Sequence, residues 1–341
     1  MSSEVGNEET RIGPKSRRRV LVEGVLLGAL YGIVLRGIIG NSAITQWITA
    51  HDRFGVSGIM TVSFLVLGPF IIGFLSVSRV EPKSPMTVLE WIYVPWFSVG
   101  LMMLATMLFS WEGFICVAMA MPIALVVASL GGVTAGVYMR KRRVSGTTLS
   151  CMAVLPFLIA PIEARLAVPD QTRTVASEIR IHASPETVWR NIERVPAIAP
   201  TELETNWTHR IGFPRPVEAT LSFEGVGGVR HASFERGLMF IETVTAWEPE
   251  QRLAFSIKAD SANIPTTTLD EHVTIGGRYF DVLDGEYSLE PLANGDVMLH
   301  LVSHQRLSTD FNGYAGLWTD AVMQNLQTSI LKVIQHRCEH A

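Results

Sequence analysis

Hydrophobic positions are distributed unevenly along this chain of 341 residues. The first half contains long uninterrupted apolar runs, whereas the second half alternates between short apolar and polar stretches. The long runs cover residues 20–39, 56–77, 88–109, 114–139 and 148–167. Each has roughly 20 residues, enough for a helix to cross about 30 Å of hydrocarbon. The pattern predicts an all-α transmembrane bundle of five helices over residues 20–167, after a polar tail of residues 1–19.

Basic residues lie mainly in alternate loops of this bundle. The tail carries Arg11, Lys15 and residues 17–19, and the loop after the fourth run reads RKRR over residues 140–143. The loop after the second run carries two more, Arg79 and Lys83, whereas the first loop of the opposite side carries Arg53. Cytoplasmic loops are enriched in Lys and Arg, so the tail is predicted to be cytoplasmic.

Five crossings would place the rest of the chain outside the cytoplasm. The predicted location is therefore an integral membrane, of the bacterial inner or plasma type, with an extracytoplasmic C-terminal domain. The fifth run is the weakest, because Pro156 and Pro161 interrupt it. If that run does not cross, the C-terminal domain is cytoplasmic. The first run follows a long polar tail and is read as a retained signal-anchor.

Three charged residues fall within the first four runs: Glu23, Arg36 and Glu90. All three lie near the ends of their helices. Long side chains at such positions reach the membrane surface, so we expect this behaviour and no transport pathway.

The second half begins with a polar linker, residues 168–173, and a domain predicted for residues 174–341. Residues 174–182 alternate between two faces, which is typical of a strand. Ser184 then supplies a helix N-cap with Pro185 at the first helical position, and a short apolar helix face follows. Six more strands are predicted, and a long helix over residues 314–338 closes the chain; the strands cover residues 217–224, 228–235, 238–247, 252–258, 279–289 and 296–307.

This order and its local motifs resemble the START-like, SRPBCC superfamily, which includes polyketide cyclase/dehydrase-like proteins. The matching stretches are IRIHASPETVWRNI at the start, VTAWEPEQRLAFSI in the middle strands and YSLEPLANGDVMLHLVSHQRL in the last hairpin. The resemblance covers about half of the chain. It implies an α+β helix-grip domain, in which a curved antiparallel sheet holds the C-terminal helix around a hydrophobic ligand cavity. The implied ligand is an apolar or amphipathic small molecule, lipid-like or polyketide-like.

Six residues are candidates for ligand binding, since they carry polar or aromatic groups on the predicted strands and terminal helix. They are Glu242, Asp281, Tyr287, His300, His304 and Trp318. Alternation shows which residues share a strand face but leaves open which face is inward. His300 and His304 would lie ~13 Å apart along a strand, too far to hold one metal ion. No metal and no cofactor are expected.

Net charge and chemistry narrow the possible functions. The formal net charge is −4 and no basic face stands out, so nucleic acid is not an expected partner. The expected partners are the lipid bilayer and a hydrophobic ligand, and another membrane protein is a further candidate. A cyclase/dehydratase- or hydrolase-type enzyme that uses the histidines and acids, and a membrane-anchored regulator or assembly factor, are the alternatives.

Overall fold

A computed structural model describes residues 17–39, 61–78, 86–141, 144–163, 166, 169–260 and 274–340. Most of the polar tail and several of the basic loop residues named above (Arg53, Arg79, Lys83 and residues 142–143) lie outside the described residues. So do residues 56–60 of the second apolar run. The chain divides into two compact units, and each is described by itself.

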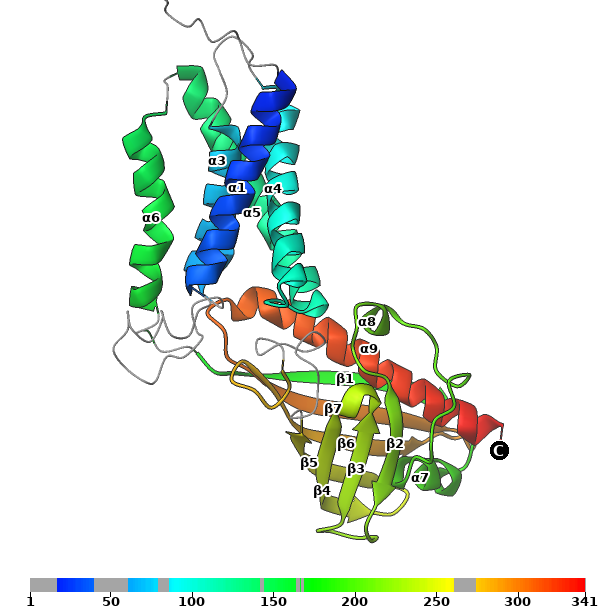
Figure 1. The fold of residues 1–341 in the computed structure, drawn as a ribbon. Coiled ribbons are helices and arrows are strands. Elements are labelled where there is room, and N and C mark those ends of the chain that lie inside the picture. The colour runs from blue at the N-terminus through cyan, green and yellow to red at the C-terminus, as the bar shows by residue number, and fades with distance from the viewer. Residues whose placement is uncertain are drawn as a thin grey trace, which may run out of the picture. The chain divides into compact units, whose positions relative to one another are not determined.

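The N-terminal unit is built from apolar helices (Figure 1). It contains α1 (Arg17–Ile39), most of α4 (Val88–Leu108) and most of α5 (Phe114–Lys141), and all three helices are long and apolar enough to cross a membrane. The second and fifth runs form shorter apolar helices in the described residues. These are a π-helical turn (Ser63–Leu67) continued by α3 (Gly68–Val77), and α6 (Gly146–Glu163). The prediction of five membrane-spanning helices is thus confirmed in part, because three of the five described helices have the necessary length.

Proline accounts for the irregular second helix. Pro69 has no amide hydrogen to donate to the carbonyl four residues earlier, and the π-helical turn directly precedes it. The fifth apolar run was predicted to form a helix over residues 148–167. The described helix, α6, has its last residue at Glu163.

Small residues let the helices of this unit approach closely. A Cβ added at Gly24 of α1 would lie 2.2 Å from the Ser76 carbonyl oxygen of α3. A Cβ at Gly73 of α3 would lie 1.9 Å from the Ala128 carbonyl oxygen of α5. Helices in membranes associate through such small residues, because lipid provides no hydrophobic drive for association. The close contacts at glycine are compatible with helices that pack against each other in a membrane.

Glu90 is compensated within this unit. Its side chain is buried and accepts hydrogen bonds from the Arg17 guanidinium at 2.6 Å and from the Thr87 amide at 2.7 Å. Arg36 is buried as well, whereas Glu23 pairs with Arg19 at 3.0 Å. The negative charge of Glu90, in the first turn of α4, is thus compensated by the Arg17 guanidinium.

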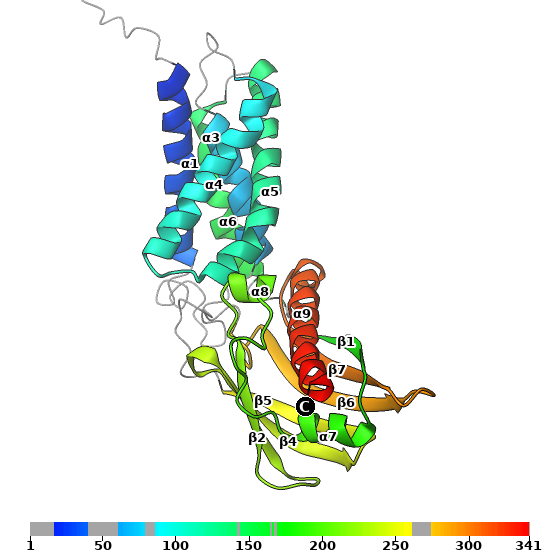
Figure 2. The same ribbon diagram turned by 90° about the vertical axis from the view of Figure 1, so that its right-hand side faces the viewer.

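The C-terminal unit is a seven-stranded antiparallel sheet and one long helix, as expected. The sheet order is β1-β7-β6-β5-β4-β3-β2. Its strands are β1 (Gln171–Ile181), β2 (Pro216–Leu221), β3 (Val229–Phe234), β4 (Met239–Glu248), β5 (Arg252–Asp260), β6 (Phe280–Pro291) and β7 (Val297–Leu307). Figure 2 shows the sheet curving around α9 (Asn312–Glu339), with the short helices α7 (Pro185–Glu193) and α8 (Trp207–Arg210) beside it.

The start of this unit folds as its local sequence predicts. The Thr187 amide donates to Ser184 Oγ at 3.3 Å, which caps α7, and Pro185 occupies the first turn. The apolar face of α7 carries Val188, Trp189 and Ile192, and it is buried in one core with residues of the sheet and α9. Three other members of this core, Phe255, Tyr287 and Leu301, also line a cavity between the sheet and α9.

Candidate ligand-binding cavity

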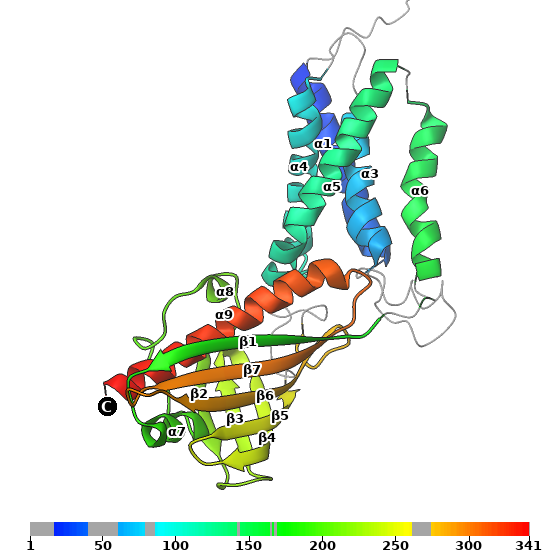
Figure 3. The ribbon, with the colours of Figure 1, turned by 180° about the vertical axis from the view of Figure 1, so that it is seen from behind.

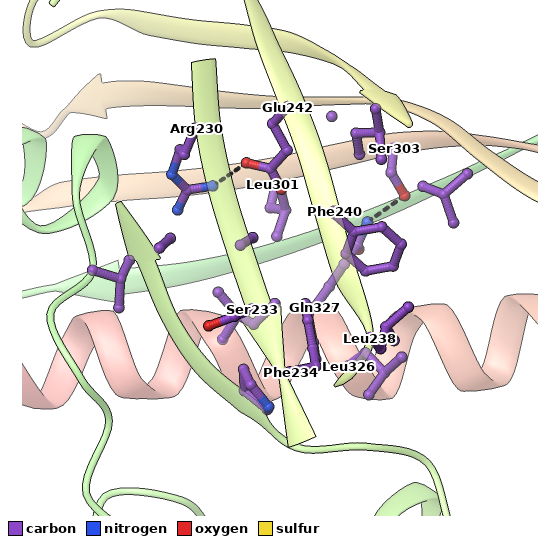
Figure 4. A pocket seen from close by; sticks show the side chains of 18 of the residues that line it. Arg230, Ser233, Phe234, Leu238, Phe240, Glu242, Leu301, Ser303, Leu326 and Gln327 are labelled. Atoms are coloured by element: carbon purple, nitrogen blue, oxygen red, sulfur yellow. Dashed lines mark hydrogen bonds and ion pairs between the residues drawn. The ribbon is translucent and has the colours of Figure 1, made fainter. Parts of the chain in front are cut away.

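A cavity lies between the concave face of the sheet and α9 (Figure 4). Its volume is about 130 Å³, about ten times the 10–15 Å³ that one water needs. Its wall is mainly apolar, with Val195, Ile198, Phe213, Ala219, Ala232, Phe234, Leu238, Phe240, Phe255, Ile257, Ile275, Val282, Leu301, Met323, Leu326 and Ile330 among the lining residues. Ligand pockets typically combine such a wall with a few polar groups.

A buried ion pair supplies two of these polar groups. Arg230 of β3 and Glu242 of β4 are directly opposite each other in the sheet, and Arg230 Nη1 donates to Glu242 Oε2. Both side chains are buried. Burial raises the pKa of the Glu242 carboxyl above its ordinary value, while the neighbouring guanidinium opposes this effect. The two charges compensate each other inside an apolar wall.

Tyr287 of β6 adds a hydroxyl to the same region. Burial raises the pKa of Tyr287 to about 12, so this group stays neutral. Its hydroxyl interacts with Arg230, whose guanidinium carbon also lies 5.6 Å from the centre of the Phe255 ring. Gly285 faces that ring across the strands, and a Cβ there would lie 2.7 Å from it. The absence of a side chain at Gly285 therefore leaves room for the Phe255 ring.

Gln327 is the polar group that α9 contributes. Its Nε2 donates to the Val175 carbonyl oxygen at 3.2 Å and to Ser303 Oγ at 2.9 Å. Figure 4 shows the bond to Ser303 beside the cavity. Met323, Gln327 and Ile330 line the cavity together, because residues spaced by four and three share one face of a helix.

Two of the six candidate residues, Glu242 and Tyr287, line this cavity. Asp281 does not, and a β-bulge explains why. Val282 pairs with Gln305 and Asp284 pairs with His304, so Leu283 is an extra residue in β6. The extra residue moves Val282 onto the inward face before the bulge, whereas Tyr287 is on that face after it. Asp281 consequently lies on the opposite side, where burial raises the pKa of its carboxyl.

Strand β7 lies between β1 and β6 in the sheet (Figure 3). Its burial alternation places His300 and His304 on the outer face of the strand. Every second residue of that strand is buried, and the buried set, which includes Leu301 and Ser303, faces the cavity. His304 Nδ1 lies 2.6 Å from Asp284 Oδ1, and His300 lies 3.2 Å from each of two glutamates of the neighbouring strands, Glu178 and Glu290. The histidines thus belong to rows of charge pairs on the outside of the sheet.

Trp318 is the sixth candidate and is not among the lining residues. It precedes Gln327 by nine residues, about two and a half turns, and so lies on the opposite side of α9. Its ring centre is 6.3 Å from that of Trp207 in α8.

Arg230 and Gln327 are cavity residues that the sequence analysis missed. The sequence contains a pattern that could have indicated each of them. Arg230 shares a strand face with the small residue Ala232, and Gln327 shares a helix face with Met323 and Ile330. Apolar positions dominated the reading of that helix. In the described part of the chain, no group of three or more His, Cys, Asp or Glu is arranged to hold a metal ion.

Comparisons with known proteins were made by sequence and by structure. No protein-family model and no curated protein matches the sequence. Among solved structures, a START superfamily protein from Mycobacterium smegmatis is 12% identical, covering 49% of this chain and 97% of its own, with a TM-score of 0.32. Truncated norcoclaurine synthase from Thalictrum flavum is 15% identical, covering 50% and 97%, with a TM-score of 0.30. An uncharacterized protein from Rhizobium leguminosarum is 14% identical, covering 52% and 100%, with a TM-score of 0.32.

The C-terminal half has a START-like fold. This assignment rests on the strand order, the curved sheet and the enclosed long helix of this chain, and the low identities and TM-scores add no argument about function. The START-like domain provides an apolar cavity with a compensated ion pair, a neutral phenol and an amide. Such a set can bind and orient an amphipathic molecule.

Proposed function

We propose that this protein is an integral membrane protein whose START-like domain binds a hydrophobic or amphipathic small molecule. The observation that carries the proposal is the apolar cavity between sheet and α9, with Arg230, Glu242, Tyr287 and Gln327 in its wall. An apolar wall binds hydrocarbon by removing it from water, and a few fixed polar groups select the polar end.

Binding has more support than catalysis. No histidine or cysteine is among the lining residues of the described cavity, whose two acids are Glu218 and Glu242. Glu242 is committed to Arg230, and the histidines proposed as acid/base partners lie on the outer face of β7. A general acid or base must lie within hydrogen-bond reach of the substrate, and no His/acid pair is found among the lining residues that the structure describes.

We further propose five membrane crossings, with the START-like domain outside the cytoplasm. If only α1, α4 and α5 crossed, the basic segments near residues 79–83 and 140–143 would lie on the side opposite the basic tail. Crossing by all five apolar helices brings these three basic segments to one side, as the distribution of Lys and Arg in membrane proteins favours. The shorter helices would then be accommodated by local thinning of the bilayer.

Photolabelling tests the binding proposal. The full chain in detergent is irradiated with a medium-chain alkyl diazirine, and labelled peptides are mapped by mass spectrometry. Label is expected on cavity segments such as the one that contains Met323 and Leu326. Ala232→Phe fills the cavity and should abolish that label, whereas His231→Phe adds the same ring to the exposed face of β3 and should preserve it. Equal labelling of both variants would reject the proposal.

A further inference from the structure

We propose that the first turns of α5 close one end of the cavity, and that the ligand passes between the cavity and the lipid bilayer at this closure. The inference rests on the proposed function and specifies the route by which the ligand reaches its site. Residues 106–122, which include the start of α5, belong to the same compact unit as the START-like domain. Their contacts with that domain therefore lie within one unit.

The start of α5 packs against the wall of the cavity. Ile115 is 1% exposed and forms one apolar cluster with Leu238, Ile275 and Val282, three residues that line the cavity. Met119, one turn further along α5, packs against the same cluster. Its carbonyl oxygen accepts a hydrogen bond from the Tyr314 hydroxyl of α9. Apolar packing and this hydrogen bond together hold α5 against the cavity.

The order of contacts along α9 places this packing at one end of the cavity. Tyr314 and Met323, in the first half of α9, take part in the contacts with α5. Gln327 follows in the cavity wall, and Leu331 and Ile334 then pack with α7 in the other core. At the α7 end the enclosing residues belong to the START-like domain itself. At the opposite end they include the start of α5, which precedes that domain in the chain.

The connection between α4 and α5 exposes a patch of large apolar side chains. Leu108, Phe109 and Phe114 are exposed, and Trp111 lies beside Phe109 with ring centres 5.2 Å apart. The two helices that this connection joins are both long and apolar enough to cross a membrane. Aromatic residues at the ends of such helices lie at the membrane surface. The occupant of this patch is therefore the bilayer, which brings lipid next to the closure formed by Ile115.

Proline allows the closure to open. Pro122 lies inside α5, and the boundary between the two compact units directly follows it. Proline has no amide hydrogen for the Ala118 carbonyl oxygen, so the helix lacks one of its hydrogen bonds at this point and bends more easily there. The first turns of α5 can thus move away from the cavity while the rest of the helix keeps its hydrogen bonds.

Chain-length dependence of ligand exchange tests the route. The full chain is reconstituted in phosphatidylcholine nanodiscs with 1,1,1-trifluorooctane or 1,1,1-trifluorodecane at equal mole fraction in the lipid. Saturation transfer in ¹⁹F NMR measures exchange between the bilayer and the cavity, whose resonance is identified by its loss in Ala232→Phe. Two extra methylenes lower the aqueous concentration at that mole fraction roughly fifteenfold. Exchange through water should slow by that factor, whereas direct exchange with the bilayer should have similar rates for both probes.

Two substitutions test the closure by α5. Tyr314→Phe removes only the hydroxyl that holds Met119, and should speed exchange about twofold to tenfold through the loss of one hydrogen bond. Ile115→Ala removes most of the buried side chain and should speed exchange at least as much. The matched controls are Tyr138→Phe and Leu130→Ala, which make similar changes at exposed positions of α5 and should leave the rate unchanged.

The outcomes separate this inference from the proposed function. The absence of a resonance that Ala232→Phe removes would reject both. A cavity resonance whose exchange slows with chain length would leave the binding function intact and reject the bilayer route. A cavity resonance whose exchange is unchanged by both Tyr314→Phe and Ile115→Ala would likewise leave binding intact and reject the closure by α5.

Discussion

At the scale of single residues, Arg230 and Glu242 are the side chains whose environment departs furthest from ordinary surface chemistry. Two charges removed from water are tolerated because they face each other across neighbouring strands, with Tyr287 beside them. Such a pair adds little stability relative to apolar residues, but the loss of one partner leaves the other charge buried and unpaired. The pair therefore constrains the cavity wall strongly.

Glu242→Ala should destabilise the START-like domain by about 3–5 kcal/mol, because it leaves the buried Arg230 charge unpaired. Glu286→Ala removes the partner of Arg252 in an exposed pair with a distance of 2.9 Å, and should cost less than about 1 kcal/mol. Denaturant unfolding of the full chain, followed by tryptophan fluorescence, measures both changes. A cost for Glu242→Ala no larger than for Glu286→Ala would contradict the buried-pair account.

Glu202 carries a pH-dependent part of the stability. Its carboxylate accepts from Arg337 Nε at 2.6 Å and from Nη2 at 3.0 Å, and these hydrogen bonds lower the pKa of Glu202 below its ordinary value. A carboxyl with a lowered folded-state pKa stabilises the protein above its unfolded pKa of about 4.3, and this stabilisation is lost as pH falls through the folded-state pKa.

Glu202→Gln should accordingly lower the melting temperature at pH 7 and reduce the further loss of stability between pH 5 and the acid range. Melting curves across that pH range, compared with those of the unmodified protein, provide the measurement. Parallel curves for the two proteins at every pH would show that the Arg337 contact does not lower the pKa of Glu202.

At the scale of elements, β6 decides which side chains reach the cavity. The bulge at Leu283 exchanges the inward and outward residues of this strand, and Gly285 makes room for the Phe255 ring. The bulge brings Val282, Gly285 and Tyr287 to one face although their spacing is not uniformly two.

Gly285→Ala should destabilise the domain by roughly 1–3 kcal/mol and displace Phe255 into the cavity, since the added Cβ meets the ring at 2.7 Å. Gly313→Ala is the matched control in the first turn of α9, where an added Cβ meets nothing within 4 Å. Unfolding of the two variants and of the unmodified chain tests the difference. Equal stability of all three would mean that the ring moves aside without cost.

Sequence patterns predicted the elements well and the inward faces poorly, for identifiable reasons. Cap and breaker residues such as Ser184 and Pro185 act locally, so the first helix and the seven strands follow from the sequence. Whether His300 or Leu301 faces α9 depends on the pairing of distant strands, and the bulge in β6 leaves no mark in its composition. Glu242 was found because it alternates with the apolar residues Phe240 and Val244, whereas Arg230 required the register between β3 and β4.

At the scale of the whole molecule, the number of membrane crossings determines on which side of the membrane the START-like domain lies. Val226→Cys places a thiol at an exposed turn of that domain, and Ser3→Cys places one in the tail. In a variant without the native cysteines, a membrane-impermeant maleimide added to intact spheroplasts should label Val226→Cys and not Ser3→Cys. The reverse pattern, or labelling of neither before permeabilisation, would contradict an extracytoplasmic domain.

The central claim is that the cavity between the sheet and α9 holds a small molecule. Mass spectrometry of the organic extract from the purified full chain tests this most directly, with Ala232→Phe and His231→Phe purified in parallel. The account predicts a hydrophobic or amphipathic compound in extracts of the unmodified protein and His231→Phe, and its absence from the folded Ala232→Phe protein. The same compounds in equal amounts in all three extracts would contradict it.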